Sequence, residues 1–299
     1  MSMARTIREF ERWRLEQDAK HKTLGFVPTM GYLHRGHLSL IQAAKAENDL
    51  VAVSIFVNPT QFGPGEDYER YPRDLQHDYE AAVAAGADVV FHPSAEEIYP
   101  SGASTMVEVT GKMTTKLCGA SRPNHFRGVT TVVSILFNII RPDRAYFGQK
   151  DAQQAVIIRK MVRDLHLPVQ VTVCPIIRDE DGLALSSRNI FLTPQERAQA
   201  RSLNRGLQKA MEYASSGVDG SRKVSILTKI IRAEIACQPL SAIDYVEILD
   251  AETLDELTEI APDRDALAAV AVRFGSTRLI DSRILSAAPK GEPLLCTSI

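Results

Sequence analysis

Two histidines three residues apart, His34 and His37, lie in a turn that is rich in glycine. A short apolar run over residues 25–27 precedes this turn, and residues 38–45 follow it with a helical period. Backbone N–H groups at a helix N-terminus attract anions, and two imidazoles could add donors to the same anion. The turn therefore indicates a phosphate or nucleotide site. An ordinary strand-to-helix connection that contains two histidines by chance explains the spacing equally well.

Four further polar clusters carry side chains that could act on the same ligand. They are residues 58–61, which end in Gln61; residues 122–128, with Arg122, His125 and Arg127; residues 148–154, with Lys150 and Gln154; and residues 186–188. A guanidinium group binds a planar anion bidentately, and an ammonium group can place a point charge on a phosphate. No serine, cysteine or histidine has the pattern of a hydrolytic triad, which disfavours covalent catalysis by the protein. The clusters predict a site that holds a nucleotide polyphosphate beside a small polar organic acid.

The apolar pattern indicates which elements must position these clusters. Runs over residues 25–27, 50–57 and 144–147 have the composition of parallel strands, and each leads directly into one of the clusters. In an open α/β sheet the carboxyl ends of such strands face one crevice. We therefore predict an α/β fold with a Rossmann-like doubly wound parallel sheet. Further strands are expected over residues 87–91, 105–109 and 168–177, and helices over residues 5–17, 74–85 and 129–140.

The character of the chain changes after residue 177. An acidic turn, which has the pattern of a solvated hairpin or a hinge, leads into two helical patterns and then three strand-like runs. The turn covers residues 178–182, the helical patterns 194–215 and 220–237, and the strand-like runs 242–249, 267–272 and 277–280. Helices followed by strands with hairpin-length links predict a smaller α+β unit. We predict a first domain over residues 1–177 and a second, lid-forming domain over residues 178–299.

Composition excludes some classes of protein. The 299 residues are 44% hydrophobic and 24% charged, which is ordinary for a globular chain, and the net charge of −2 argues against a nucleic-acid partner. Neither a membrane span nor the apolar core of a signal peptide is evident, so a cytoplasmic location is expected. The scattered cysteines predict free thiols: Cys118, Cys174, Cys237 and Cys296. The last four residues formally fit a prenylation box, but a frayed tail is the expected structure.

In their order along the chain, the motifs resemble those of the pantothenate synthetase family, the pantoate–β-alanine ligases of a nucleotidyltransferase superfamily with a His-x-Gly-His phosphate motif. The resemblance rests on residues 28–37, 58–62, 122–129, 147–151 and 186–189. It implies ATP- and Mg²⁺-dependent condensation of pantoate with β-alanine through a pantoyl adenylate, with release of AMP and pyrophosphate, as a step of coenzyme A biosynthesis. It also implies a homodimer.

The resemblance also implies roles for individual residues. Those expected to act in catalysis by holding phosphates are His34, His37, Lys150, Ser186, Ser187 and Arg188. Further ATP contacts are expected from Pro28, Thr29, Met30, Gly31, Gly36, Phe147, Gly148, Asp151, Ile177 and Leu185. Pantoate is expected to contact Met30, Gln61, Phe62, Arg122 and Gln154. Asp78 matches a position near magnesium, and no β-alanine pocket is implied.

Several assignments compete with a plain structural role. Asp74 and Asp78 lie four residues apart on one expected helix and could form a solvated face. His125 could order its own loop, and the two serines of residues 186–188 could terminate a hairpin. Gln153 could face solvent or the core instead of pantoate.

Two other functions also fit parts of the pattern. One is another adenylyl transferase of the same superfamily, which would be expected to lack the glutamines Gln61 and Gln154. The other is a tRNA-binding synthetase fragment or a non-catalytic nucleotide sensor, against which the near-neutral charge counts.

Overall fold

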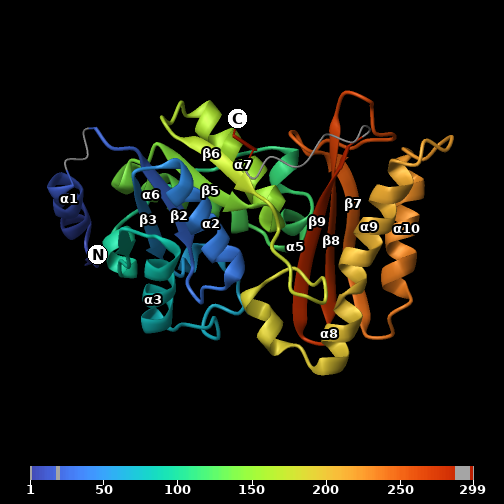
Figure 1. Cartoon of the computed structure of the whole chain (residues 1–299), viewed down its shortest axis with the longest axis horizontal. Helices are drawn as coiled ribbons and strands as arrows, with labels where there is room; N and C mark the ends of the chain where they lie inside the picture. Colours follow the sequence, from blue (N-terminus) through green and yellow to red (C-terminus); the bar gives the residue numbers. More distant parts are fainter. Residues whose placement is uncertain (1, 18–20, 287–296, 299) are drawn as a thin grey trace.

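A computed structural model describes residues 2–17, 21–286 and 297–298, which form two sheets (Figure 1). The larger sheet has the order β1-β4-β3-β2-β5-β6-β10. Its strands are β1 (Ser2–Ala4), β2 (Leu24–Thr29), β3 (Leu50–Ile55), β4 (Val89–Phe91), β5 (Arg144–Gly148), β6 (Gln170–Cys174) and β10 (Thr297–Ser298). The pairs from β1 to β6 are parallel, and β10 runs antiparallel to β6. The order reverses beside β2, which pairs with both β3 and β5, and ligands bind at such switch points.

Helices cover both faces of the larger sheet. They are α1 (Ile7–Glu16), α2 (Arg35–Glu47), α3 (Leu75–Ala85), α4 (Ala95–Ile98), α5 (Cys118–Ser121), α6 (His125–Ile140) and α7 (Ala152–Asp164). Successive strand residues face opposite ways, so Phe26 packs in a core cluster with α1, α6 and α7, while Val27 packs in a second cluster with α2 and α3. This two-sided burial explains why the strands are continuous apolar runs. It confirms the predicted doubly wound α/β fold.

The smaller unit places helices on one face of an antiparallel sheet, as the chain-order pattern predicted. Its helices are α8 (Pro194–Ala200), α9 (Ser202–Ala214) and α10 (Val224–Ala236), and its strands are β7 (Ser241–Asp250), β8 (Asp265–Phe274) and β9 (Thr277–Ser286). Leu203, Ile231 and Val270 belong to one buried cluster that joins the helices to the sheet. Short 3-10 turns lie between the helices and strands of the two units: η1 (Pro59–Gln61), η2 (Lys112–Thr114), η3 (Gln149–Asp151) and η4 (Ser187–Phe191).

Two expected elements differ near the site. The strand expected over residues 105–109 does not form, because the backbone of Val107 bonds to side chains: its N–H donates to Thr131 Oγ1 at 3.0 Å, and its carbonyl accepts from Thr130 Oγ1 at 2.6 Å. Helix α6 begins at His125 instead of residue 129, so Gly128 lies inside it. A Cβ at Gly128 would lie 2.7 Å from the Gln61 nitrogen, so the glycine permits close approach of α6 to η1.

Other differences lie away from the site. The helical pattern over residues 194–215 is divided into α8 and α9, and the three-residue strand β1 had no separate sequence signal. Thr297–Ser298 pairs with β6, whereas a frayed end was expected; Cys296 lies outside the described residues. The domain limits of 1–177 and 178–299 stay a prediction. Among the described helices, none has both the length and the apolar character of a membrane span.

Candidate active site

All five polar clusters line one cavity of about 220 Å³. The ends of β2, β3 and β5 contribute three of them, the start of α6 contributes the fourth, and the segment around η4 contributes the fifth from the smaller unit. The cavity lining includes every residue predicted to contact ATP or pantoate except Gly31, and it does not include Asp78. The topological argument therefore correctly predicted which segments come together.

The turn after β2 is held by a buried carboxylate. Gly31 and Tyr32 both have positive φ, at 83° and 52°, a conformation that is unfavourable for a tyrosine. Asp78, which is 1% exposed, accepts hydrogen bonds from the Tyr32 N–H at 2.7 Å and the Leu33 N–H at 2.6 Å. Hydrogen bonds to an ionised acceptor are stronger than neutral ones. Asp78 therefore stabilises a backbone shape that the residues of the turn would not adopt alone.

Two backbone contacts set the tautomers of the histidine pair. His34 is the N-cap of α2, and its Nδ1 accepts from the Gly36 N–H at 3.2 Å. His37 Nδ1 accepts from the His34 N–H at 3.3 Å, and the two rings stack with centroids 4.0 Å apart. Because each Nδ1 is an acceptor, each neutral ring carries its proton on Nε2. Neither Nε2 donates to another described residue, so both N–H groups are available to a ligand.

Both imidazoles are neutral near pH 7. Burial lowers the pKa of His34 to about 4, and the charge of Lys150 acts in the same direction. Burial also lowers the pKa of His37 well below its ordinary value, with smaller contributions from His34 and Lys150. The rings can therefore donate hydrogen bonds to a phosphate, but in the ligand-free protein they bring no positive charge. The positive charge among the lining residues comes from Lys150, Arg188 and Arg122.

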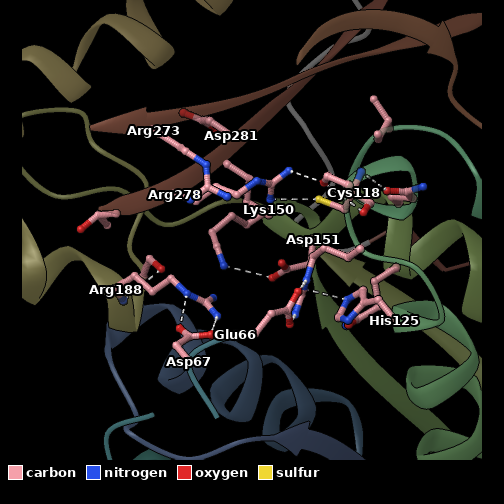
Figure 2. Close-up of a pocket in the computed structure, with 18 of the residues that line it drawn as sticks. Glu66, Asp67, Cys118, His125, Lys150, Asp151, Arg188, Arg273, Arg278 and Asp281 are labelled. Atoms are coloured by element: carbon pink, nitrogen blue, oxygen red, sulfur yellow. Dashed lines mark hydrogen bonds and ion pairs between the residues drawn. The ribbon is translucent and has the colours of Figure 1, made fainter. Parts of the chain in front are cut away.

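Lys150 and Arg188 are each engaged by a carboxylate (Figure 2). Lys150 Nζ lies 3.1 Å from Asp151 Oδ2. Arg188 makes a bidentate pair with Asp67, at 2.9 Å and 3.0 Å. Burial alone would raise the pKa of Asp67, but the hydrogen bonds and charge of Arg188 lower it below its ordinary value. An incoming phosphate would compete with Asp67 for the guanidinium group.

Another part of the cavity wall contains the two predicted glutamines, Gln61 and Gln154. Gln61 is 9% exposed; its Oε1 accepts from Asn58 Nδ2 at 3.2 Å, and its Nε2 contacts Met30 Sδ at 2.9 Å. Gln154 lies on the first turn of α7, and its side chain makes no hydrogen bond with another described residue. Phe62 adds an apolar surface beside them. This wall offers amide groups and methyl-sized apolar contacts to one small ligand.

His125 supports this wall. Its Nδ1 lies 2.8 Å from the Gln61 carbonyl oxygen and its Nε2 lies 3.1 Å from Arg122 Nη1, so the ring donates to the first and accepts from the second. Burial, reinforced by the Arg122 charge, lowers the pKa of His125 to about 4. Arg122 is itself paired with Glu66 at 2.5 Å. Both ring nitrogens are occupied, which favours a role for His125 in ordering its loop.

Contacts also decide the roles of the acidic pair on α3, of Gln153 and of the two serines. Asp78 is buried, so it does not form a solvated face with Asp74, which caps α3 instead. Gln153 faces the interior, where its amide bonds to Cys118, Met113 and Lys116.

The two serines of the fifth cluster do not terminate a hairpin. They follow the hairpin that is closed by the Arg178–Ala184 bridge. Ser186 caps η4, and the Ser187 hydroxyl donates to the Tyr71 hydroxyl at 3.5 Å.

Four lining or supporting residues were missed from sequence. Asn58 is 1% exposed and bonds to Gln61, Thr60, Tyr99 and the Gly128 carbonyl, which makes it the hub of the η1 loop. Glu66, Asp67 and Tyr71 come from the next loop and contact residues far away in sequence. The turn residues around Asn58 were a usable local signal. The roles of Glu66, Asp67 and Tyr71 depend on tertiary partners, so no local signal in the sequence could indicate them.

The donor set does not form a metal site of its own. Among the described residues, no group of three or more His, Cys, Asp or Glu side chains is placed to hold an ion. Both oxygens of Asp78 are already hydrogen-bond acceptors for the turn. Magnesium commonly takes one or two carboxylates together with substrate phosphates, and no cluster among the described residues identifies its protein ligands. The magnesium assignment of Asp78 stays a prediction without structural support.

Comparison with known proteins gives a consistent result over nearly the whole chain. The family model described as pantoate–β-alanine ligase matches residues 2–284. The pantothenate synthetase of Moorella thermoacetica is 52% identical over 285 residues, which cover 95% of this chain and 99% of that protein. That of Roseiflexus castenholzii is 53% identical over 287 residues, covering 96% of this chain and all of the relative.

Solved structures agree with these sequence relatives. The pantothenate synthetase of Thermus thermophilus superposes with a TM-score of 0.88 at 45% identity, over 96% of this chain and 100% of that one. The pantoate–β-alanine ligase of Francisella tularensis, solved in complex with "beta-gamma ATP" and β-alanine, gives a TM-score of 0.77 at 36% identity, over 97% and 100% of the two chains. The chain belongs to the pantoate–β-alanine ligase family.

Proposed function

We propose that this chain condenses pantoate with β-alanine at the expense of ATP, through an enzyme-bound pantoyl adenylate. The observation that carries the proposal is the composition of the cavity, which combines two kinds of chemistry. Lys150, Arg188 and the Nε2–H groups of the histidine pair supply phosphate donors, and Gln61 and Gln154 supply amides for a small hydroxy acid. The reaction requires such groups to meet at one phosphorus atom.

In the first step a pantoate carboxylate oxygen bonds to the α-phosphorus of ATP, and the bond from that phosphorus to the pyrophosphate oxygen breaks. In the second step the β-alanine nitrogen bonds to the acyl carbon, the bond from that carbon to the AMP oxygen breaks, and the amine loses a proton. Neither step needs a protein nucleophile. Displacement at phosphorus depends mainly on positioning and on charge stabilisation.

We assign the charge stabilisation to Lys150 and Arg188. The neutral rings of His34 and His37 donate hydrogen bonds through Nε2, in a direction fixed by their backbone contacts. Donors that are already oriented need no reorganisation as charge develops, which is the main source of electrostatic catalysis. Ser187 and the other residues around η4 close the phosphate side from the smaller unit.

We assign pantoate selection to the part of the wall that carries the two glutamines. The side chain of Gln61 is fixed by Asn58 and its carbonyl by His125, so its amide is oriented before the ligand arrives. Met30 and Phe62 provide the apolar surface that the methyl groups of pantoate require. A pocket whose amides are already oriented rejects analogues that leave those amides unpaired.

The decisive experiment measures AMP formation from ATP with pantoate and β-alanine together and with each omitted. We expect AMP release to require both acceptors, and exchange of labelled pyrophosphate into ATP to require pantoate alone. AMP release independent of β-alanine would exclude the ligase function. A stable dinucleotide product would instead support the rival adenylyl transferase.

The remaining expectations are part of the same proposal. Magnesium is expected to enter with the phosphates of ATP, and no step above uses it. A homodimer in the cytoplasm is expected from the family resemblance and the composition. Size-exclusion chromatography with light scattering tests the dimer, and a mass of one 33.0 kDa chain would contradict it.

A further inference from the structure

A second and larger cavity, of about 480 Å³, adjoins the first and lies between the two sheets. The two cavities are continuous through seven shared lining residues: Arg122, His125, Lys150, Asp151, Gln154, Ser186 and Arg188. The larger cavity is bounded on its far side by β8 and β9 of the smaller unit, which contribute Arg273 and Arg278. Figure 2 shows Arg273 and Arg278 on the same side of Lys150, with Arg278 joined to the neighbourhood of Cys118 and the Lys150 ammonium joined to Asp151. The roles argued so far do not use Arg273 or Arg278.

The two strand arginines are direct neighbours. Arg273 and Arg278 are Cα partners in the antiparallel register of β8 and β9. Directly opposed residues in such a pair have Cβ atoms about 5 Å apart, and like charges there are destabilising. Arg278 is stabilised by Asp244 at 2.8 Å and also contacts Cys118 and Ser121. The side chain of Arg273 makes neither a hydrogen bond nor an ion pair with any other described residue, although its backbone is paired within the sheet.

The counter-ions in the cavity leave positive charge unmatched. Three of its other cations have carboxylate partners: Arg122 pairs with Glu66, Lys150 with Asp151 and Arg188 with Asp67. The fourth carboxylate of the lining, Asp281, is bidentate to Arg178 and therefore unavailable. Within the part of the chain that is described, Arg70 and Arg273 are the lining cations without a counter-ion.

We propose that Arg273 and Arg278 form an anion site for a diphosphate group, adjacent to the adenylation site. A diphosphate suits this site because it can accept from two neighbouring guanidinium groups and reach Lys150 at the same time. Such an anion also removes the repulsion between the opposed arginines. The inference rests on the proposed function, in which pyrophosphate is the leaving group. The diphosphate is either that free product or the β- and γ-phosphates of bound ATP.

The test measures binding of inorganic pyrophosphate to the full chain by calorimetry, without turnover. Arg273→Gln is the decisive variant because its side chain makes no contact that folding requires. We expect it to weaken pyrophosphate binding about tenfold, the loss typical of one charged hydrogen-bond partner. Arg273→Lys, which keeps the charge, is expected to retain most of the affinity. Arg232→Gln, an exposed arginine on α10 outside the cavity, is the matched control and is expected to bind as the wild type does.

A second titration distinguishes the two sources of diphosphate. If Arg273→Gln weakens binding of non-cleavable α,β-methylene ATP as much as that of pyrophosphate but leaves AMP binding unchanged, the site holds the tail of the bound nucleotide. If it weakens pyrophosphate binding alone, the site receives the leaving group. Unchanged pyrophosphate binding in Arg273→Gln, or an equal loss in Arg232→Gln, overturns the proposal. AMP formation by the wild type is measured separately, so failure of the anion site cannot be mistaken for failure of the ligase reaction.

Discussion

At the scale of single residues, catalysis depends on which groups carry charge. Because the histidine pair is neutral, the negative charge that develops at phosphorus is stabilised mainly by Lys150, together with Arg188. Removing one preoriented donor of this kind commonly lowers turnover about 100- to 1,000-fold. We expect Lys150→Ala to lower kcat by that amount and to change KM for pantoate only slightly. Steady-state kinetics check this.

Lys160→Ala is the control for Lys150→Ala. Lys160 also lies on the α7 side of the fold, but it pairs with Asp164 on the surface and does not line the cavity. The kcat of the Lys160→Ala enzyme should match that of the wild type. A Lys150→Ala enzyme with normal kcat and a raised KM for pantoate would contradict the assigned role.

The two hydrogen bonds that the Asp78 carboxylate accepts predict an effect on stability and on ATP binding. In Asp78→Asn one of the two N–H groups of Tyr32 and Leu33 would face an amide NH₂, so the turn would lose one acceptor. We expect a loss of stability of about 1–3 kcal/mol and a raised KM for ATP. Chemical unfolding and amide chemical shifts of these two residues measure the effect.

Asp74→Asn is the matched control, because asparagine caps a helix as well as aspartate does. A magnesium titration separates two explanations for any defect of Asp78→Asn. Rescue by high magnesium would indicate a metal ligand and would contradict a role in supporting the turn.

Two histidines with lowered pKa, the partly buried His34 and the buried His125, indicate how stability depends on pH. The pKa of both His34 and His125 falls from the ordinary 6.5 to about 4 on folding, so the unfolded chain binds more protons between these values. Stability is therefore complete above about pH 6.5 and is lost as the pH falls toward 4. A shift of this size corresponds to at most about 3 kcal/mol per group.

Urea unfolding at pH 7 and pH 5 measures this dependence. We expect the loss between the two pH values to be smaller in His34→Gln than in the wild type. His21→Gln changes an exposed histidine and should leave the loss unchanged. An identical pH dependence in all three proteins would show that His34 is not the titrating group.

At the scale of elements, the approach of α6 to the η1 loop fixes the pantoate wall. Gly128→Ala would place a methyl group against the backbone of Thr60 and Gln61, which cannot move without displacing Asn58. We expect a loss of about 1–3 kcal/mol in unfolding free energy and a raised KM for pantoate. Gly63→Ala, where a Cβ would make only ordinary contacts, should be near neutral.

Elements were predictable from sequence where a local pattern decided them. The continuous apolar run over residues 50–57 needed no tertiary information to indicate a strand buried on both faces. The strand expected over residues 105–109 was wrong because Thr130 and Thr131, from a distant helix, supply its hydrogen bonds. The start of α6 was wrong because Gly128 looked like a helix boundary and is a packing site.

The difference between local patterns and contacts of distant residues also explains which parts of the candidate site could be predicted. Residue types that bind phosphates and acids are visible locally, and parallel-strand topology brings them together. The partners of those residues are not visible, because a pair such as Arg188 with Asp67 spans 121 positions and depends on how the two units meet. The neutrality of His34 likewise depends on burial, which no local pattern reports.

At the scale of the molecule, contacts between the two units lie around the site. Arg35 on α2 pairs with Asp179, Ser282 on β9 donates to the Gln149 carbonyl, and Arg188 pairs with Asp67. Because Asp67 competes with phosphate for Arg188, we expect Asp67→Asn to tighten binding of non-cleavable ATP about threefold. Calorimetric titration of Asp67→Asn and of the wild type with the non-cleavable ATP measures this change in affinity.

The control for that prediction is Glu69→Gln, an exposed acid on the same loop whose side chain has no partner among the described residues. It should leave the affinity unchanged. Weaker nucleotide binding in Asp67→Asn would mean that Asp67 orients Arg188 for the phosphate instead of competing with it.

The position of β2 in the sheet has a consequence for biosynthesis. β2 pairs with β3, which follows soon after it, and with β5, whose residues are more than 100 positions later. A ribosome adds about 5–20 residues per second, so one edge of β2 waits on the order of ten seconds for its partner. During that interval the nascent chain carries the phosphate turn without Lys150 and exposes an apolar strand edge. The central strand of the finished site is therefore the segment of the growing chain that most needs protection from other chains.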